Sequence, residues 1–355
     1  MKKVDPINIR GVLVGGNYPP FIVAEMSGNH NGDIGRARAL IKEAKKAGAH
    51  AVKLQTYTAD TITIDHDGPE FVLDSGLWSG RRLHELYAEA HTPWEWHPEL
   101  FRLAEEIGIT LFSAPFDNSA IDFLEDLNCP AYKIASPELI DLPLISRAAE
   151  TGKPLILSTG MATEEEISEA IEVARSKKTK DVVVLHCTSS YPASLSDANL
   201  RTIPAIAKKH NVNVGLSDHT EGILASIMAV ALGACMVEKH FTLKRADGGV
   251  DSAFSLETQE LKALVSEVSR ANSTLGQPSF HPLEAEQMVL ANRRSLYVTS
   301  AIARGEKFTL ENVRSIRPGK GLKPKYLQTI LGKTAARAIN FGEPLDETMI
   351  TEKIR

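Results

Sequence analysis

Two histidines stand at the ends of two consecutive apolar runs, where they could hold a metal ion. His219 ends Val-Gly-Leu-Ser-Asp-His and His240 ends Val-Glu-Lys-His, and each follows a polar residue two positions earlier, Ser217 or Glu238. Residues two apart in a strand point to the same face, so these four side chains are expected to converge at one end of a parallel sheet. Two neutral imidazoles with open positions beside them suit a divalent cation. The alternative is that each is a strand-end histidine satisfied by hydrogen bonds.

Other strand-like runs hold charged and hydroxyl side chains that packing alone does not need. They are Glu25, Lys53 with Gln55, Lys133 with Ser136, and Ser158. A lysine is costly to bury in an apolar strand unless an anion pairs with it, so two such lysines indicate buried carboxylates or an anionic ligand. Ser158 also precedes the start of a capped helix, a position that suits phosphate. A structural ion pair between Glu25 and Lys53 is the alternative to a ligand site.

This set of side chains is compatible with two chemistries. In the first, Lys133 forms a Schiff base with a carbonyl substrate, as in an aldolase. In the second, the lysines bind phosphoenolpyruvate, and a metal polarises an aldehyde that C3 of phosphoenolpyruvate attacks. Composition does not choose between them. A catalytically silent sugar- or ice-binding protein is a third class, but it leaves the strand-end lysines and histidines unexplained.

The segments that position these residues alternate between strand-like and helix-like patterns. Apolar runs occupy residues 21–27, 51–57, 110–116, 131–136, 154–160, 181–191, 212–219 and 235–242. Helix-like segments follow most of them; one ends at Gly48, and another opens with a capping box of Thr163 and Glu166. Eight such units predict an α/β fold and favour a (β/α)8 TIM barrel rather than an open doubly wound sheet. No Gly-x-Gly-x-x-Gly follows the first run, which lowers the dinucleotide-binding alternative.

The pattern of the barrel stops after Gly276. We expect a catalytic barrel over residues 1–276, a linker over 277–290 and a small domain over 291–355. The small domain repeats Ile-x-x-Gly-Glu at Ile302 and Ile339. A domain of this size buries little core alone, so it is expected to dock on the barrel or on a second subunit.

The connection over residues 58–109 is longer than the others and contains three tryptophans, Trp78, Trp94 and Trp96. A long insertion after a barrel strand often forms a lid or a substrate wall. Aromatic faces suit the methyl groups of a deoxy sugar. Simple packing within the insertion is the equal alternative.

The composition excludes several classes of protein. The 355 residues carry a net charge of −5, which argues against a general surface for nucleic acid or anionic membrane. Three cysteines, Cys129, Cys187 and Cys235, form no Cys-x-x-Cys pair, so neither a disulfide framework nor a zinc finger is indicated. No signal-like segment or membrane-length apolar run is present, and we expect a cytoplasmic protein.

A series of motifs, in order, carries a family resemblance. They are Ala-Glu-Met-Ser-Gly-Asn-His-Asn-Gly, Val-Lys-Leu-Gln-Thr-Tyr, Ser-Ala-Pro-Phe, Tyr-Lys-Ile-Ala-Ser, Leu-Ser-Thr-Gly-Met-Ala, Gly-Leu-Ser-Asp-His-Thr and Glu-Lys-His-Phe-Thr. On these residues the chain resembles the sialic acid synthase family, transferases that condense phosphoenolpyruvate with a sugar. Residues 316–322, Ile-Arg-Pro-Gly-Lys-Gly-Leu, resemble the antifreeze-like (SAF, β-clip) C-terminal domain of that family.

Four further stretches resemble the branch of the family that makes pseudaminic acid. They are Gly-Leu-Trp-Ser-Gly-Arg, Thr-Pro-Trp-Glu-Trp, Arg-Ala-Asp-Gly-Gly-Val-Asp-Ser-Ala-Phe-Ser and Arg-Arg-Ser-Leu-Tyr-Val. This resemblance implies that phosphoenolpyruvate condenses with the open-chain aldehyde of 2,4-diacetamido-2,4,6-trideoxy-L-altrose. Water then attacks C2, the C–O bond breaks and phosphate leaves. Legionaminic acid and N-acetylneuraminate synthesis are the alternatives within the family.

The resemblance also implies roles for individual residues. The metal, Mn²⁺ with Mg²⁺ or Co²⁺ as alternatives, would bind His219 and His240, and Glu25 would act as acid or base. Phosphoenolpyruvate would be held by Lys53, Lys133, Ser136, Ser158 and Ser217. The sugar would be faced by Gln55, Tyr191, Glu238, Asp251 and Arg317. Arg317 would come from the other subunit of a domain-swapped homodimer.

Two positions depart from the pattern of the family. Ala114 stands where a hydroxyl is expected, which puts one phosphate contact in doubt. Ser189 stands where an amide would meet an N-acetylmannosamine group, and the shorter side chain leaves space for a bulkier diacetamido sugar.

Overall fold

In a computed structural model that describes residues 4–352, the chain divides into two compact units, Met1–Gly276 and Gln277–Arg355. Each unit has an apolar core of its own, as separate domains do.

The first unit is a closed parallel barrel, which confirms the predicted fold class. Strand β10 pairs with both β9 and β3, so the ring closes and leaves no free sheet edge. Each predicted apolar run contains one strand. The strands are β3 (Phe21–Glu25), β4 (Ala51–Thr56), β5 (Thr110–Pro115), β6 (Tyr132–Ile134), β7 (Leu155–Ser158), β8 (Val182–Cys187), β9 (Asn213–Asp218) and β10 (Met236–His240).

Some strands are shorter than the apolar runs that predicted them. β8 ends at Cys187, although the run continues to residue 191. The residues beyond Cys187 lead to Pro192, which has no N–H to extend a ladder of hydrogen bonds. In the same way, β9 ends at Asp218 although its run continues to residue 219, so His219 lies one residue past the strand.

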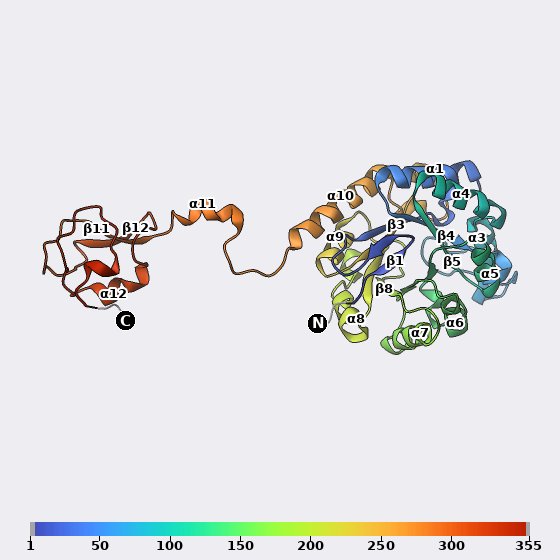
Figure 1. Ribbon diagram of the computed structural model, residues 1–355. Helices are drawn as coiled ribbons and strands as arrows, with labels where there is room; N and C mark the ends of the chain where they lie inside the picture. Colours follow the sequence, from blue (N-terminus) through green and yellow to red (C-terminus); the bar gives the residue numbers. More distant parts are fainter. Residues whose placement is uncertain (1–3, 353–355) are drawn as a thin grey trace. The chain divides into compact units, whose positions relative to one another are not determined.

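Helices lie around the outside of the ring of strands (Figure 1). They are α1 (Ile34–Ala47), α4 (His97–Ile107), α5 (Asn118–Asp126), α6 (Leu142–Glu150), α7 (Glu164–Ser176), α8 (Thr202–His210), α9 (Leu224–Ala231) and α10 (Thr258–Leu275). Gly48 ends α1 with φ 91°, and Thr163 with Glu166 forms the predicted capping box of α7. Among residues 4–352, no helix has the length and apolar character needed to cross a membrane.

Alternation along the strands separates the core from the site. In β3 and β4, the buried side chains Ile22, Val52 and Leu54 share one apolar cluster with helices α1, α4 and α10. Their neighbours Glu25 and Lys53 must then face the inside of the barrel, since successive side chains point to opposite faces. The same pattern that packs the helices therefore directs polar groups inward.

A hairpin that the sequence analysis did not predict precedes the barrel. Strand β1 (Ile7–Ile9) pairs antiparallel with β2 (Val12–Val14). Buried side chains of Ile7, Ile9 and Val14 join the same cluster as Phe21, the first residue of β3. The hairpin therefore covers the amino-terminal end of the barrel.

The long connection over residues 58–109 contains two short helices, α2 (Ala59–Ile62) and α3 (Leu83–Ala90), before the barrel helix α4. Trp94 stacks on Phe123 of α5 with ring centroids 4.8 Å apart, and the ring of Trp96 meets that of His30 at 5.4 Å. Both tryptophans therefore pack the insertion onto the barrel.

The second unit is built around the repeat seen in the sequence. Ile302 and Ile339 exchange two backbone hydrogen bonds of 2.9 Å, and both are buried. Each is followed by a glycine in a left-handed turn, Gly305 with φ 83° and Gly342 with φ 84°. The other elements of the unit are β11 (Ser295–Val298), β12 (Val313–Ile316), α11 (Gln287–Leu290) and α12 (Leu327–Ile330).

Close packing of β9 against its neighbours gives a test of the barrel. A Cβ on Gly215 would overlap the carbonyl oxygen of Met236 and lie 2.5 Å from the side chain of Leu185. Since backbone cannot yield cheaply, Gly215→Ala should lower the free energy of unfolding by about 1–3 kcal/mol, measured by urea denaturation.

Gly35→Ala is the matched control, because its new Cβ would meet the Asp33 side chain at 3.1 Å and no backbone. This control should be destabilised much less than Gly215→Ala, because the exposed Asp33 side chain can shift. Equal stability of the two variants would contradict the packing of β9 described above.

Candidate active site

Two lysines and two glutamates meet inside the barrel at the carboxyl ends of its strands. Lys53 Nζ lies 2.8 Å from Glu25 Oε2 and 3.7 Å from Glu238 Oε1, and Lys133 Nζ lies 3.2 Å from the same Glu238 oxygen. All four residues are at most 5% exposed. The ion pair of Glu25 with Lys53, offered above as an alternative to a ligand site, is therefore one part of a four-charge cluster.

The charges of this cluster do not cancel fully near neutral pH. Burial raises the pKa of Glu25 to about 7, although Lys53 acts to lower it. Burial acts in the same way on Glu238, but Lys133 and Lys53 outweigh it and hold the pKa of this carboxyl below its usual range. A partly protonated Glu25 leaves a surplus of positive charge on the lysines. The cluster therefore suits an anionic ligand.

Two buried hydroxyl groups lie at the carboxyl ends of β6 and β7, the strands next to one another that include Lys133. Ser158 is 1% exposed, and its Oγ has no hydrogen-bond partner among residues 4–352. The Gly160 N–H donates to Ser136 Oγ at 3.0 Å, and a side chain on Gly160 would overlap Ser189. A buried polar atom without a partner is unfavourable, so Ser158 is ready to bind a ligand oxygen.

Ser217 is the last residue predicted to hold phosphoenolpyruvate. Ser217 Oγ donates to Glu238 Oε1 at 3.3 Å and so joins the cluster. Ala114, which has no hydroxyl to offer a phosphate, lies fully buried in β5.

The two histidines face each other beside the cluster. Their ring centroids are 5.4 Å apart. His219 Nδ1–H donates to the carbonyl of Thr188 at 3.0 Å, which leaves its Nε2 lone pair for another partner. His240 Nδ1 is buried without a hydrogen-bond partner among the described residues, and burial together with His219 lowers the pKa of His240 well below its usual value. The alternative of a satisfied histidine therefore fits His219 in part, but not His240 Nδ1.

These imidazoles fit a divalent cation that takes its other ligands from elsewhere. A neutral imidazole is the form that binds metal, and an Nδ1–H bonded to a carbonyl fixes the ring for binding through Nε2. Burial acts to lower the pKa of His219, but Cys187 and the Thr188 carbonyl raise it above its usual value, so a cation would compete with a proton there. Within residues 4–352, no group of three or more His, Cys, Asp and Glu side chains could hold a metal. Two protein nitrogens with open positions suit an ion that binds substrate or water.

The barrel residues that are predicted to face the sugar lie next to the four-charge cluster. Gln55 Nε2 donates to Glu25 Oε1 at 2.8 Å and to Ser27 Oγ at 3.2 Å, and Ser27 Oγ donates to Asp251. The ring of Tyr191 packs against that of His219, with centroids 4.4 Å apart. Arg317 belongs to the second unit, where it is exposed directly after β12.

Trp78 differs from the other tryptophans of the insertion. Its indole N–H donates to the carbonyl of Val250 at 2.9 Å, and its ring meets those of Tyr191 and Phe254 at 5.6 and 6.3 Å. Phe254 in turn contacts His240 at 4.9 Å. The insertion thus contributes one aromatic side chain to a wall beside the histidines, in addition to its packing role.

Glu138 is a candidate site residue that the sequence analysis missed. It lies in the turn Pro137–Ile140 after β6, and its Oε2 is buried with no hydrogen-bond partner among residues 4–352. Burial raises its pKa to about 7, while Lys133 acts to lower it. Strand periodicity does not predict which way a side chain points beyond the end of a strand. The one feature of the sequence that could have indicated Glu138 is its position five residues after Lys133.

A buried ion pair ties together the strands that carry the histidines. Lys239 Nζ lies 3.0 Å from Asp218 Oδ2, and both residues are at most 3% exposed. Each directly precedes one of the histidines and faces the opposite side of its strand. Lys239 also donates to the carbonyl of Thr220 at 2.6 Å. This pair therefore fixes the spacing of the backbones beneath His219 and His240.

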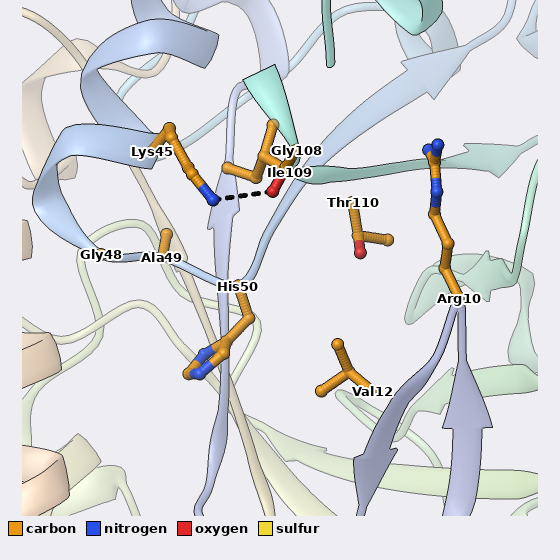
Figure 2. Close-up of a pocket in the computed structure, with 9 residues that line it drawn as sticks. All are labelled: Arg10, Val12, Lys45, Gly48, Ala49, His50, Gly108, Ile109 and Thr110. Atoms are coloured by element: carbon orange, nitrogen blue, oxygen red, sulfur yellow. Dashed lines mark hydrogen bonds between the residues drawn. The ribbon is translucent and has the colours of Figure 1, made fainter. Parts of the chain in front are cut away.

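A cavity at the opposite end of the barrel lacks such chemistry. Its volume is about 430 Å³, and Arg10, Lys45 and His50 are its basic lining residues (Figure 2). Lys45 donates to the carbonyl of Gly108 at 2.7 Å, and Arg10 pairs with Glu105 at 3.0 Å. The Ile22 N–H donates to His50 Nδ1 at 2.9 Å, so each of these three basic side chains has a partner within the protein, and the four-charge cluster is the better candidate site.

Comparison with known proteins places the chain in a family. Residues 40–279 match the NeuB family, and residues 293–351 match the SAF domain. The chain belongs to the NeuB family. Both matches confirm the predicted resemblance, including the C-terminal antifreeze-like domain.

Its relatives include curated enzymes and solved structures. The chain is 47% identical over 330 residues to the pseudaminic acid synthase of Campylobacter jejuni, covering 92% of this chain and 95% of that protein. It is 43% identical to the pseudaminic acid synthase of Helicobacter pylori, covering 92% and 96%. The crystal structure of N-acetylneuraminic acid synthetase from Leptospira borgpetersenii has a TM-score of 0.74 and 33% identity, covering 81% and 96%.

The buried pair beneath the histidines gives a test of the site. Lys239→Met leaves the buried Asp218 carboxylate without a cation, although Thr220 and Ser226 still donate to it, and should lower the free energy of unfolding by about 3 kcal/mol. The double variant Asp218→Asn/Lys239→Met removes both charges and should recover most of this loss in urea denaturation. A double variant no more stable than the single one would contradict the pairing.

Proposed function

We propose that this protein synthesises pseudaminic acid from phosphoenolpyruvate, water and the open-chain form of 2,4-diacetamido-2,4,6-trideoxy-L-altrose. The observation that carries the proposal is the buried cluster of two lysines and two glutamates beside two facing imidazoles. Relatives named for this activity, at 43 and 47% identity, support the choice of sugar over the more distant N-acetylneuraminic acid synthetase at 33%. Ser189, shorter than the amide of sialic acid synthases, agrees with a bulkier diacetamido sugar.

The reaction balances without any further reactant. C3 of phosphoenolpyruvate forms a C–C bond with the aldehyde carbon, and water adds at C2. The bond from C2 to the phosphate oxygen then breaks, phosphate leaves, and C2 becomes a ketone. One proton of the water ends on the aldehyde oxygen, which becomes a hydroxyl, and the other leaves with phosphate.

The residues of the barrel divide this work. Lys53 and Lys133 hold the negative charge of phosphoenolpyruvate, with Ser136 and Ser158 donating to its oxygens and Ser217 turning its proton from Glu238 to the ligand. Glu25, with a pKa near 7, is suited to hold or release a proton at neutral pH. Tyr191, Glu238, Gln55 and Asp251 face the sugar.

A divalent cation, Mn²⁺ in this proposal with Mg²⁺ or Co²⁺ as alternatives, would be held by His219 and His240. When bound, it would polarise the carbonyl of the aldehyde. Tyr191 and Phe254 pack against His219 and His240 and so hold the orientation of the two imidazole rings.

We also propose that the protein acts as a domain-swapped homodimer, in which the partner's Arg317 reaches the sugar. A small C-terminal domain gains stability when it docks on another surface. A guanidinium from that domain would add a charge-assisted hydrogen bond to the sugar.

A Schiff-base aldolase is a second candidate, because burial lowers the pKa of Lys133 and so favours its nucleophilic amine form. The ion pair of Lys133 with Glu238 at 3.2 Å opposes this, since it stabilises the ammonium. Borohydride would trap a covalent adduct on Lys133 in the aldolase and none in the condensing enzyme.

The proposal predicts chelator-sensitive release of phosphate. Purified protein with Mn²⁺ and phosphoenolpyruvate should release phosphate with the diacetamido-altrose sugar and not with N-acetylmannosamine. The measurement is a colorimetric assay of the phosphate released. Release with N-acetylmannosamine or the legionaminic acid precursor instead would move the activity to a sister branch. Phosphate release that persists in excess chelator would contradict the proposed requirement for a divalent cation.

Metal binding by the two imidazoles predicts a selective loss in a histidine variant. His219→Ala should weaken Mn²⁺ binding by at least about tenfold, because one of two protein ligands is removed. The measurement is titration of free Mn²⁺ by electron paramagnetic resonance, with circular dichroism to verify the fold.

His186 in β8 gives the matched control, because it is also buried but its Nε2–H donates to the carbonyl of Ala198 at 2.7 Å. His186→Ala should retain the affinity for Mn²⁺. Equal affinities in His219→Ala and the unmodified protein would remove the metal assignment.

A further inference from the structure

Ser27 is held in a backbone conformation that serine rarely adopts. It directly follows Met26 beyond the end of β3, has a φ of 47° and is 4% exposed. This left-handed region favours glycine, and a non-glycine residue persists there when its surroundings hold it. Such residues concentrate at functional sites. A glycine would fold more easily at this position, so the side chain of Ser27 calls for an explanation.

The hydroxyl of Ser27 connects two polar side chains from distant parts of the barrel. It donates its proton to Asp251 Oδ2, in the segment after β10, and accepts a proton from Gln55 Nε2 of β4 at 3.2 Å. Gln55 also donates to Glu25 Oε1 at 2.8 Å. A continuous chain of hydrogen bonds therefore runs from Asp251 through Ser27 and Gln55 to Glu25.

This chain fixes which groups are left for a ligand. Ser27 has one proton, and once it is given to Asp251 the oxygen can only accept from Gln55. The amide of Gln55 must then turn its NH₂ toward Ser27 and Glu25, which leaves its carbonyl oxygen as an acceptor. The carboxylate of Asp251 is an acceptor as well. Both groups would recognise donors, namely the hydroxyl and acetamido N–H groups of a sugar.

Burial makes Asp251 depend on this support. Asp251 is 7% exposed, and burial raises its pKa, whereas the hydrogen bonds from Ser27 and from the N–H of Gly28 act to lower it. Without the hydroxyl, Asp251 would lose a fixed donor and the freedom of its carboxylate to rotate would increase. The orientation of Gln55 would be lost at the same time.

We infer that Ser27 is a positioning residue that aligns Asp251 and Gln55 and thereby sets the affinity for the acceptor sugar. The inference rests on the proposed function, in which these two residues face the sugar. The lysines that would hold phosphoenolpyruvate are linked to Ser27 through Gln55 and Glu25, two side chains away. Loss of the hydroxyl should therefore affect the sugar and spare phosphoenolpyruvate.

Two variants separate the hydroxyl from the backbone. Ser27→Gly removes the hydroxyl and fits the left-handed conformation, so its fold is not at risk. Ser27→Ala removes the same hydroxyl and keeps the strained backbone. Both should raise KM for the diacetamido-altrose sugar about tenfold, as expected for a lost hydrogen bond to a charged group, with KM for phosphoenolpyruvate changed less than about twofold.

Ser113→Ala is the matched control. Ser113 in β5 is also fully buried, but its hydroxyl pairs with Thr56 at 2.6 Å, away from Asp251. This variant should leave KM for the sugar unchanged. A general effect of removing a buried hydroxyl would instead appear in all three variants.

Each result decides between the readings of Ser27. If Ser27→Ala keeps the KM of the unmodified protein, or if KM for phosphoenolpyruvate rises as much as that for the sugar, the positioning role is overturned while the proposed function stands. If the unmodified protein releases no phosphate with this sugar, the proposed function fails, and with it the role defined for that sugar.

Discussion

Burial of four charges at the carboxyl end of the barrel is the constraint on which the candidate site depends. Each of Glu25, Lys53, Lys133 and Glu238 would be strongly unfavourable in this place alone. They are tolerated because each lies within 4 Å of an opposite charge, on strands that the closed barrel brings together. The register of the strands is therefore not free to change, since a shift of one residue would turn these side chains toward the apolar helices.

The same cluster explains why an anion and a proton would be coupled in this site. Lys53 is shared between two carboxylates, and its pull lowers the pKa of Glu25 against the effect of burial. A phosphate drawn onto the lysines would compete for that pull and add negative charge, and both effects favour the protonated form of Glu25. Under the proposed function, binding of phosphoenolpyruvate would therefore help to keep a proton close to the reacting atoms.

Strands and loops contribute different parts of the site. The charges and the imidazole of His240 stand on strands, whose positions are fixed by pairing on both sides. Asp251, Tyr191 and Trp78 stand on connecting segments, which can vary without disturbing the barrel. Ser27 links the two kinds of support, because its hydroxyl joins Asp251 to Gln55 on β4. A change of sugar specificity is thus possible at the loops while the anion site of the barrel is retained.

What the sequence could predict follows from which patterns are local. The eight strands and the convergence of His219 with His240 follow from strand periodicity and from parallel pairing, both of which can be read within a few residues. The contact of Ser27 with Asp251 spans 224 residues and has no local signal. Glu138 lies in an irregular turn, where neither helical nor strand spacing tells which way a side chain points. The hairpin of β1 and β2 was missed for a related reason: strands of three residues are too short to show alternation, and burial of Ile7, Ile9 and Val14 depends on the barrel that they cover.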